Sequence, residues 1–427
     1  MLAAMSTAPV PSSSQAAAVF RDRGDACPGA LRLHPADDGA LARVRIPGGV
    51  LRVDQASALG RAARELGDGE LHLTSRGNVQ MRGLHADCGG ELAERLSAAG
   101  LLPSWRHERV RNVVASPLSG LDGHGFADVR PWLPALDELI CASETAAGLS
   151  GRFLFALDDG RGDVAGLGAD VTVRATPDGD AWLRIGESDR VALVSAEDAP
   201  ATAVLAAEVF LESSQGRAWR VAELGEAADD LMGEVLARLP QGRAAVAPSW
   251  PVGVPPRPGV VENPDGGTGL SVLAPLGRIT AAEWTQLTAA ASSEARLTPW
   301  RGVVLPTVPA DRLAALSTTG LITDSASPWL GVGACTGRPG CAKSRTDVRT
   351  DAAAALAPGG GLPAYFSGCE RRCGRPRGDH VDVVATEAGG YRISVVRDGR
   401  PAPATTIDDP PQLATALAAA RTDDTDD

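Results

Sequence analysis

The chain has 427 residues, of which 44% are hydrophobic and 22% charged, as is typical of globular proteins. That length predicts two or three domains. The formal net charge of −12 argues against a nucleic-acid partner, because neutralising phosphates needs a basic face. No apolar run is long enough to cross a bilayer, so we expect no membrane partner and a cytoplasmic location with reduced thiols.

The N-terminal part of the chain predicts a strand, helix, strand unit. Residues 1–26 are rich in Ala, Ser and Pro and lack the segments of a secretory signal, which predicts a disordered leader. Within residues 31–53, arginines alternate with hydrophobic side chains, as on a strand with one cationic face. Residues 54–67 have a helical pattern that ends at a glycine, and residues 71–84 return to strand.

A weaker copy of this unit lies in residues 271–308. In both copies a glycine, Gly49 or Gly277, stands ten residues before a helical leucine, Leu59 or Leu287. We therefore predict an internal duplication, with two unrelated α+β units as the alternative.

Further strands and helices follow each copy, and a Pro- and Gly-rich stretch separates the two halves. Helices are expected at 133–147, 198–213 and 224–239. The predicted boundaries are a leader at 1–26, a first half-domain at 27–100, a first larger domain at 101–240, a linker at 241–269, a second half-domain at 270–325, a second larger domain at 326–420 and a solvated acidic tail at 421–427.

Four of the seven cysteines lie within 39 residues near the C-terminus. Cys335 and Cys341 are separated by five residues, which include two glycines and a proline, so the backbone can loop around a ligand. Cys369 and Cys373 are separated by three residues, and a helix there would place both sulfurs on one face. Four thiolates in this arrangement predict a [4Fe–4S] cluster.

Three other interpretations of these cysteines remain open. Structural zinc also takes four cysteines, but a five-residue gap is unusual for its ligand pairs. Disulfides are disfavoured in a chain with few cysteines and no secretory signal. Ordinary buried cysteines would not be expected to concentrate in this way.

The cysteine pattern resembles the cluster motif of the sirohaem-dependent nitrite and sulfite reductases, with Arg375 and Pro376 following soon after. Residues 42–50, 73–83 and 110–120 also resemble segments of that family, and the likeness extends over most of the chain. It implies a duplicated α+β fold with pseudo-twofold symmetry. In that fold, two ferredoxin-like half-domains join two larger mixed α/β domains, with the site in the groove between the halves.

The same resemblance implies roles for arginines, because a tetrapyrrole carries carboxylates that guanidinium groups bind well. The implied substrate-binding residues are Arg43, Arg45, Arg76, Asn78, Gln80, Arg111 and Arg152, with Arg43 and Arg111 also catalytic. Only one of the 41 basic residues is a lysine, so any single arginine is weak evidence and a surface role is the alternative for each.

One departure from the reductases favours a particular branch of the superfamily. Residues 149–154 offer Arg152 and then Leu154 where the reductases supply two polar or cationic groups to their small anion. The precorrin-3B synthases lack that pair, and residues 25–49 resemble their N-terminal stretch. This branch implies an oxygen-dependent monooxygenase of aerobic cobalamin biosynthesis, which hydroxylates precorrin-3A and closes a lactone.

The implied partners are precorrin-3A, dioxygen and an external electron donor, either an NADH-linked reductase or a ferredoxin. The implied cofactors are the [4Fe–4S] cluster and a non-haem iron, whose ligands the six scattered histidines do not reveal. Two alternatives remain: a nitrite or sulfite reductase with bound sirohaem, and a non-catalytic tetrapyrrole-binding electron-transfer protein.

Overall fold

The computed structural model describes residues 25, 27–239, 241–246, 250, 253–356, 361–376 and 378–422. Apart from Asp25, the predicted leader lies outside these residues. The predicted tail also lies outside them, except for Arg421 and Thr422. No helix among the described residues is both long and apolar enough to cross a membrane.

Two five-stranded antiparallel sheets form the two half-domains. In spatial order, the first sheet contains β1 (His34–Ala36), β2 (Gly39–Val44), β5 (Val79–Leu84), β4 (Leu71–Leu73) and β14 (Arg278–Ile279). The second contains β12 (Gly259–Glu262), β13 (Thr268–Leu273), β16 (Gly302–Leu305), β15 (Glu294–Leu297) and β3 (Val50–Arg52).

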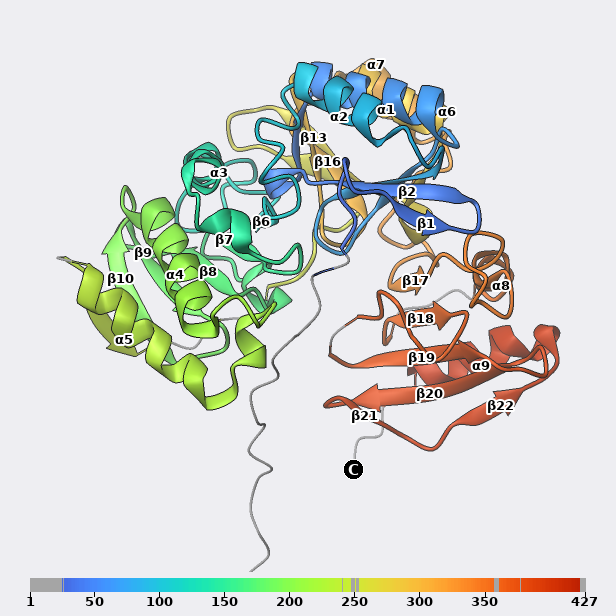
Figure 1. Cartoon of the computed structure of the whole chain (residues 1–427). Coiled ribbons are helices and arrows are strands. Elements are labelled where there is room, and N and C mark those ends of the chain that lie inside the picture. The colour runs from blue at the N-terminus through green and yellow to red at the C-terminus, as the bar shows by residue number, and fades with distance from the viewer. Residues whose placement is uncertain are drawn as a thin grey trace, which may run out of the picture.

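The half-domain helices form one layer over these sheets (Figure 1), and a single hydrophobic core continues through both halves. The helices are α1 (Val53–Leu66), α2 (Gly89–Ala98), α6 (Ala281–Ala290) and α7 (Ala310–Leu316). At the centre of the layer, Trp284 of α6 is buried and donates its indole N–H to the carbonyl of Ala56 on α1, at 2.8 Å. The predicted helix at 54–67 is thus confirmed as α1.

Each half-domain sheet is completed by a strand from the other half. β3 follows β2 in the chain but pairs with β15, bringing Arg52 opposite Glu294. In the same way β14 follows β13 but pairs with β4, bringing Arg278 opposite His72. The exchange is reciprocal, as a pseudo-twofold relation requires, and it confirms the predicted duplication.

The two glycines that marked the repeat occupy equivalent tight turns, η1 (Pro47–Gly49) and η6 (Pro275–Gly277). Both have a positive φ, 72° at Gly49 and 75° at Gly277. A Cβ on Gly49 would lie 1.9 Å from the carbonyl oxygen of Leu297, and one on Gly277 would lie 3.0 Å from that of Leu73. Each turn therefore needs glycine because the backbone of the opposite half passes so close.

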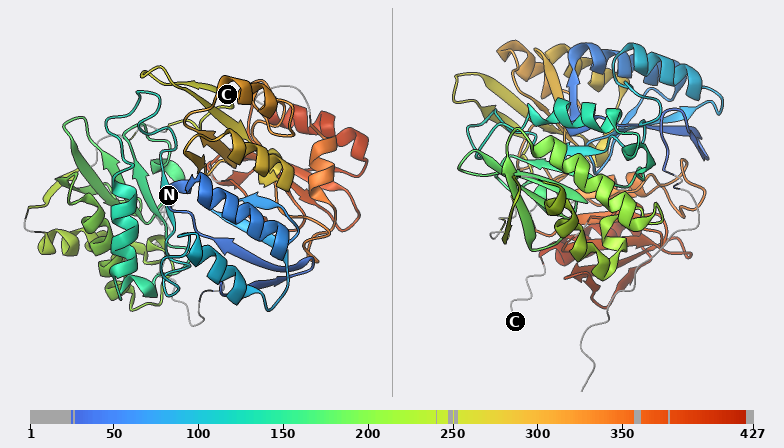
Figure 2. Two further views of the ribbon diagram at one scale, coloured as in Figure 1. Left: turned by 90° about the horizontal axis from the view of Figure 1, so that it is seen from above. Right: turned by 60° about the vertical axis from the view of Figure 1, so that its left-hand side comes forward.

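Two larger domains flank the half-domains, which lie between them when the molecule is seen from above (Figure 2). The first contains one six-stranded sheet, in which the strands lie side by side in chain order. They are β6 (Val113–Ala115), β7 (Phe155–Asp158), β8 (Val171–Ala175), β9 (Asp180–Ile185), β10 (Arg190–Ser195) and β11 (Arg243–Val246). Its helices are α3 (Trp132–Ala142), α4 (Ala199–Ser214) and α5 (Ala228–Arg238), with short turns η2 (Ala146–Gly148), η3 (Ala165–Leu167), η4 (Val221–Glu223) and η5 (Gly225–Ala227).

The second larger domain repeats this plan. Its strands are β17 (Val332–Ala334), β18 (Ala364–Ser367), β19 (His380–Ala385), β20 (Tyr391–Arg397), β21 (Arg400–Pro401) and β22 (Thr405–Ile407), and its helices are α8 (Val348–Ala354) and α9 (Pro410–Thr422). In both domains the first three strands are parallel and the next is antiparallel. The shared strand pattern supports a duplication of the whole chain, as the predicted fold class requires.

Several predicted boundaries need correction. The segment 241–269 is not simply a linker, because β11 lies in it and pairs with β10, and β12 starts the second half-domain at Gly259. The helix expected at 224–239 begins only at Ala228, after two short 3₁₀ turns. The second larger domain extends to Thr422, since α9 continues through the buried side chain of Arg421.

We expect Gly49→Ala to lower the free energy of unfolding by about 3 kcal/mol, because it adds a clash with the Leu297 carbonyl to an unfavourable φ. Thermal unfolding monitored by circular dichroism measures the effect. Gly90→Ala is the matched control, since a Cβ on this α2 residue would contact nothing within 4 Å. Equal midpoints for the two variants would contradict the close approach of the halves.

Candidate active site

The four clustered cysteines lie in loops at the carboxyl ends of β17 and β18. Cys335 directly follows β17, and its backbone N–H donates to the carbonyl of Phe366 at 2.9 Å. The backbone N–H of Gly368, just after β18, points at the Cys335 sulfur at 3.3 Å. All four thiols are free of disulfides. Backbone N–H groups aimed at sulfur are the setting that iron–sulfur clusters use.

The loop that carries Cys341 is held by the first half-domain. Arg82 on β5 donates two hydrogen bonds of 2.7 Å to the carboxylate of Asp38 and one, also 2.7 Å, to the carbonyl of Gly340. The N–H of Ala342 donates to the side chain of Asp37. The β1–β2 turn therefore fixes the position of Cys341, although it comes from the opposite half of the chain.

The segment from Cys369 to Cys373 is not the helix considered from the sequence. It is a tight turn in which the N–H of Arg372 donates to the carbonyl of Cys369 at 3.2 Å and Arg372 has a φ of 45°. The Arg372 side chain is anchored by Asp382 on β19 at 2.6 Å. The turn, rather than a helical face, orients the two sulfurs.

The cysteine arrangement fits a cubane cluster better than a zinc ion. Among the described residues, the ligand atoms of Asp68, Glu70 and His72 are the one group at the mutual spacing of single-ion ligands, and no cysteine belongs to it. Zinc would require the sulfurs to converge on one ion, whereas each cysteine of a cubane binds a different iron. Burial raises the pKa of the Cys335 thiol, and the neighbouring Cys373 and Cys341 add to the effect.

The group of Asp68, Glu70 and His72 does not suit the expected non-haem iron. Arg278 pairs with Glu70 at 3.0 Å, and Arg349 donates to Nδ1 of His72 at 3.4 Å, which leaves the proton on Nε2. Burial and then the charge of Arg349 lower the pKa of His72 to about 3. Two guanidinium groups therefore lie against this group and disfavour a cation there, although Nε2 of His72 has no hydrogen-bond partner among the described residues.

The remaining histidines give no better ligand set. Both ring nitrogens of His107 are engaged, with the Ser104 hydroxyl at 2.7 Å and the Ser143 carbonyl at 2.9 Å. In His380, Nδ1 lies 2.8 Å from the Gly378 carbonyl. The non-haem iron stays a prediction.

Two of the predicted arginines converge on one backbone carbonyl, that of Gly151, and a third lies beside them. Arg45 and Arg76 donate to this oxygen at 3.4 and 3.5 Å, and the Asn112 amide does so at 3.5 Å. Arg43 lies beside them and donates to Oε1 of Gln80 at 3.3 Å. We call Arg43, Arg45 and Arg76 the arginine cluster.

The arginine cluster has more donors than acceptors. A carbonyl has two lone pairs, but three side chains compete for that of Gly151. Nε of Arg43 and Nη1 of Arg45 are buried without a hydrogen-bond partner in the part of the chain that the structure describes. Burial, and next the charge of Arg43, lower the pKa of Arg45 to about 9, while burial and then Arg220 lower that of Arg76 to about 10. Such a cluster needs an anion.

The other predicted site residues take different positions. Arg111 is buried, donates both arms to the Asp137 carboxylate at 2.7 and 2.6 Å and reaches the Leu101 carbonyl at 2.9 Å, which makes it a structural cation. Asn78 is also structural, since its amide links the N–H of Ile46 to Asn112. The side chain of Arg152 is half exposed.

Arg152 stands apart from the arginine cluster. Its guanidinium lies over the ring of Trp219, at 4.7 Å from the centroid, and its Nε is 3.9 Å from the Asp25 carboxylate. No contact brings Arg111, Asn78 or Arg152 to the cavity described next, so these three remain predictions without geometric support.

A cavity of about 600 Å³ lies between the two halves. Arg76, Leu154 and Arg220 line it from the first half, and Pro255, Pro256 and Pro258 line it from the connection. Residues 271–274, 276–277, 298–302, 329–333, 363–365 and 374–376 line it from the second half. Because Arg76 lines the cavity and also donates to Gly151, the cavity and the arginine cluster form one site, with a volume in the range of cofactor pockets.

Tyr365 on β18 connects this cavity to the cysteines. Its hydroxyl donates to the carbonyl of Cys373 at 2.7 Å, its ring lines the cavity, and Arg301 lies over the ring at 5.5 Å. Burial raises the pKa of Tyr365 to about 12, so the phenol stays a hydrogen-bond donor. Gly374 allows the contact, because a Cβ there would lie 2.7 Å from the Tyr365 hydroxyl oxygen.

Sequence reasoning missed Tyr365, Arg220 and Arg301. Arg301 could have been found through the repeat, since the turns 74–78 and 298–302 share their hydrogen bonds. Arg301, with a φ of 62°, then occupies the place of Gly77, with a φ of 65°. An arginine held in this unfavourable conformation at a cavity is a functional signal.

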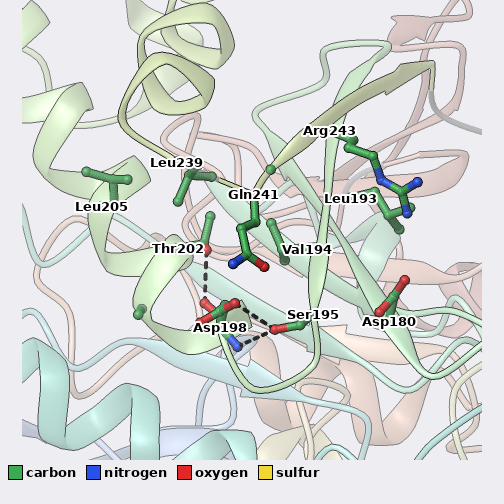
Figure 3. A pocket seen from close by; sticks show the side chains of 12 residues that line it. Asp180, Leu193, Val194, Ser195, Asp198, Thr202, Leu205, Leu239, Gln241 and Arg243 are labelled. Carbon is green, nitrogen blue, oxygen red and sulfur yellow. Dashed lines mark hydrogen bonds between the residues drawn. The ribbon is translucent and has the colours of Figure 1, made fainter.

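A second hollow, of about 580 Å³, lies at the outer edge of the first larger domain (Figure 3). Asp198 accepts a hydrogen bond from the Ser195 hydroxyl at 2.7 Å, and its backbone carbonyl accepts one from Thr202 at 2.9 Å. Leu193, Leu205 and Leu239 form much of the rest. None of the predicted site residues lines this hollow, and its hydrogen bonds join Ser195, Asp198 and Thr202 to one another.

Comparison with known proteins agrees with this architecture. The family description "Nitrite/Sulfite reductase ferredoxin-like half domain" matches residues 34–99 and 261–318, which are the two half-domains. A precorrin-3B synthase from Sinorhizobium sp is 26% identical over 417 residues, covering 93% of this chain and 88% of that protein. The two half-domains of this chain therefore have the ferredoxin-like half-domain of the nitrite and sulfite reductases, and the chain is similar to a precorrin-3B synthase along most of its length.

Other proteins are similar to this chain over smaller shares of both sequences. The chloroplastic ferredoxin–nitrite reductase of Betula pendula is 26% identical over 78% of this chain and 66% of its own length. The structure of the Mycobacterium tuberculosis NirA protein has a TM-score of 0.71 and 20% identity, covering 88% of this chain and 79% of that one. The predicted fold class is confirmed. The relatives are redox enzymes, which makes this chain an oxidoreductase.

We expect Cys369→Ser to lose most of the cluster, because one iron would lack its thiolate. Iron and acid-labile sulfide analysis of anaerobically purified protein measures the loss, together with the broad visible absorbance. Cys141→Ser is the matched control and should keep both, since Cys141 lies in α3, far along the chain from the four ligands. A full four-iron complement in Cys369→Ser, or zinc in the unaltered protein, would contradict the ligand assignment.

Proposed function

We propose that the protein is a precorrin-3B synthase, an oxygen-dependent monooxygenase that hydroxylates precorrin-3A and forms a lactone in aerobic cobalamin biosynthesis. The observation that carries the proposal is the surplus of buried guanidinium donors around Gly151, beside a cavity that Arg76 lines and that reaches the cysteine loops. A polycarboxylate macrocycle supplies the anions that these donors lack. The similarity to the Sinorhizobium synthase along nearly the whole chain supports the same choice.

In this proposal the chain's own residues bind and orient the macrocycle. Arg43, Arg45 and Arg76 hold peripheral carboxylates, with Gln80 fixing the Arg43 side chain. Cys335, Cys341, Cys369 and Cys373 would hold the cluster, which supplies electrons singly. Tyr365 separates the cluster loop from the cavity and orients the Cys373 backbone. A non-haem iron and a cytoplasmic location belong to the same proposal.

A sirohaem-dependent nitrite or sulfite reductase is the second candidate. The position of Cys373 favours it, because the three residues that follow Cys373, Gly374 to Pro376, line the cavity that a sirohaem would occupy. Against it stands the first larger domain, where Leu154 faces the cavity and Arg152 lies over Trp219 instead. Reduction of a small anion needs several cations and proton donors at that place.

We expect the anaerobically purified protein to show iron–sulfur absorbance without the strong bands of a bound chlorin. Incubation with precorrin-3A, ¹⁸O₂ and a reductant should yield a product that carries one atom of the isotope, as measured by mass spectrometry. Strong chlorin bands with nitrite or sulfite turnover would favour the reductase. Binding without any oxygenated product would leave only a tetrapyrrole carrier.

The arginine cluster gives this test its internal control. Arg76→Gln should weaken precorrin-3A binding by about tenfold, because one charge-assisted pair with a carboxylate contributes on the order of 1.5 kcal/mol. Arg64→Gln on the exposed surface of α1 is the matched control and should bind as the unaltered protein does. Equal affinities would remove the cluster from the binding site.

We also propose that an acidic one-electron donor, such as a ferredoxin, docks at the cysteine loops. Cys373 is exposed, and so are Arg338, Lys343, Arg371 and Arg375 on the same loops. None of these four cations forms an ion pair with a carboxylate of the described residues. In a chain with a net charge of −12, such a local basic surface steers an acidic partner to one place.

We expect the double variant Lys343→Glu/Arg371→Glu to slow cluster reduction by reduced ferredoxin by at least about tenfold at low salt, because it reverses the local field. Stopped-flow absorbance measures the rate. Reduced methyl viologen should reduce the variant as fast as the unaltered protein, and Arg61→Glu on α1 should leave the ferredoxin rate unchanged. A ferredoxin rate that the double variant does not alter would place the donor elsewhere.

A further inference from the structure

Cys27 lies against the arginine cluster, although the proposed function gives it no role. Nη1 of Arg43 is 3.8 Å from the Cys27 sulfur, and the sulfur is 3.8 Å from the Gly151 carbonyl oxygen. The segment is anchored at Asp25, whose carboxylate accepts from the N–H groups of Cys27 at 3.0 Å and Gly151 at 2.8 Å. The thiol is therefore one more donor pointing at the crowded carbonyl.

The space around Gly151 shows that Cys27 and Arg45 face the same point. A Cβ on Gly151 would lie 3.0 Å from Cβ of Cys27 and 3.1 Å from Nη2 of Arg45. Arg45 is only 3% exposed, and its Nη1 has no partner among the described residues. A buried, unpaired guanidinium nitrogen beside the thiol is an independent sign that an anion binds here.

The other two isolated cysteines lack these surroundings. Cys88 precedes α2 and packs against the half-domain core, and burial raises the pKa of its thiol. Cys141 lies in α3, where burial and then the charge of Asp137 raise the pKa of its thiol. Arg111 also hydrogen-bonds to Cys141, but only Cys27 is contacted by an arginine that keeps a buried nitrogen, Nε of Arg43, without a partner among the described residues. Electropositive, partly exposed surroundings are those of reactive cysteines.

We propose that Cys27 is a modification site inside the carboxylate-binding pocket, so that an alkylated Cys27 and a bound tetrapyrrole carboxylate exclude one another. The inference rests on the proposed binding of a tetrapyrrole. In the reaction with iodoacetamide, sulfur forms a bond to the methylene carbon, the carbon–iodine bond breaks, iodide leaves and the thiol proton goes to solvent. The guanidinium of Arg43 stabilises the negative charge on the attacking sulfur.

Ligand protection tests the first half of the proposal. The holoprotein is treated anaerobically with iodoacetamide, with and without saturating uroporphyrin III as a tetrapyrrole polycarboxylate, and alkylation of each cysteine is followed by peptide mass spectrometry. We expect uroporphyrin to slow alkylation of Cys27 by at least tenfold and to leave the rates at Cys88 and Cys141 unchanged. Equal protection of all three, or none at Cys27, would overturn the proposal.

The converse experiment tests the second half. Alkylated protein should bind uroporphyrin, followed by its own absorbance, at least tenfold more weakly than untreated protein. In Cys27→Ser, iodoacetamide should no longer weaken uroporphyrin binding relative to the untreated variant, whereas Cys88→Ser should remain sensitive. A Cys27→Ser protein that is still inhibited would assign the effect to another thiol and overturn the proposal.

The outcomes separate this inference from the proposed function. If untreated protein binds no uroporphyrin, the tetrapyrrole function fails and the inference fails with it. If uroporphyrin binds and Cys27 stays fully reactive, only the inference fails.

Discussion

The reciprocal exchange of β3 and β14 is the constraint on which the site depends. Each strand leaves its own half-domain and completes the sheet of the other, so neither sheet is whole without both halves of the chain. The exchange fixes Arg76 and Arg220 of the first half relative to the second-half residues beside the cysteines, such as Gly374, and these residues line one cavity. Gly49 and Gly277 make the close approach possible, because each lies beside the backbone of the opposite half.

The duplicated larger domains use the same loop for different chemistry. Ser116 follows β6 as Cys335 follows β17, and their N–H groups make equivalent bonds, to Leu157 at 3.0 Å and Phe366 at 2.9 Å. The loop after β17 presents the sulfur of Cys335. In the loop after β6, the Ser116 hydroxyl instead donates to Asp163 of the same domain, at 2.6 Å. Burial raises the pKa of Asp163 to about 7, which suits a carboxyl that serves as an internal hydrogen-bond partner. The two larger domains therefore share their strand pattern but differ in the side chain presented at this loop.

Sequence reasoning recovered what local spacing encodes. The glycine-to-leucine interval disclosed the repeat, and the cysteine spacing disclosed a loop that can surround a ligand. The strand exchange was beyond its reach, because β3 and β14 are too short for a periodic signal and their pairing is long-range. Long-range partners could not be predicted for Arg111 either. The motif around Arg111 is recognisable, but it does not reveal that the guanidinium pairs with the carboxylate of Asp137.

The arginine cluster also has a thermodynamic consequence for the fold. Removing these guanidinium groups from water, and next placing them beside other cations, is unfavourable, as the lowered pKa values of Arg45 and Arg76 reflect. The guanidinium groups stay together in the folded protein because the surrounding strands, held by the exchange, prevent them from moving apart. A polycarboxylate that binds only the folded state removes the repulsion and stabilises the protein by mass action. In the proposed function, the arrangement of charges that lowers the stability of the fold is thus the same one that binds the carboxylates of the tetrapyrrole.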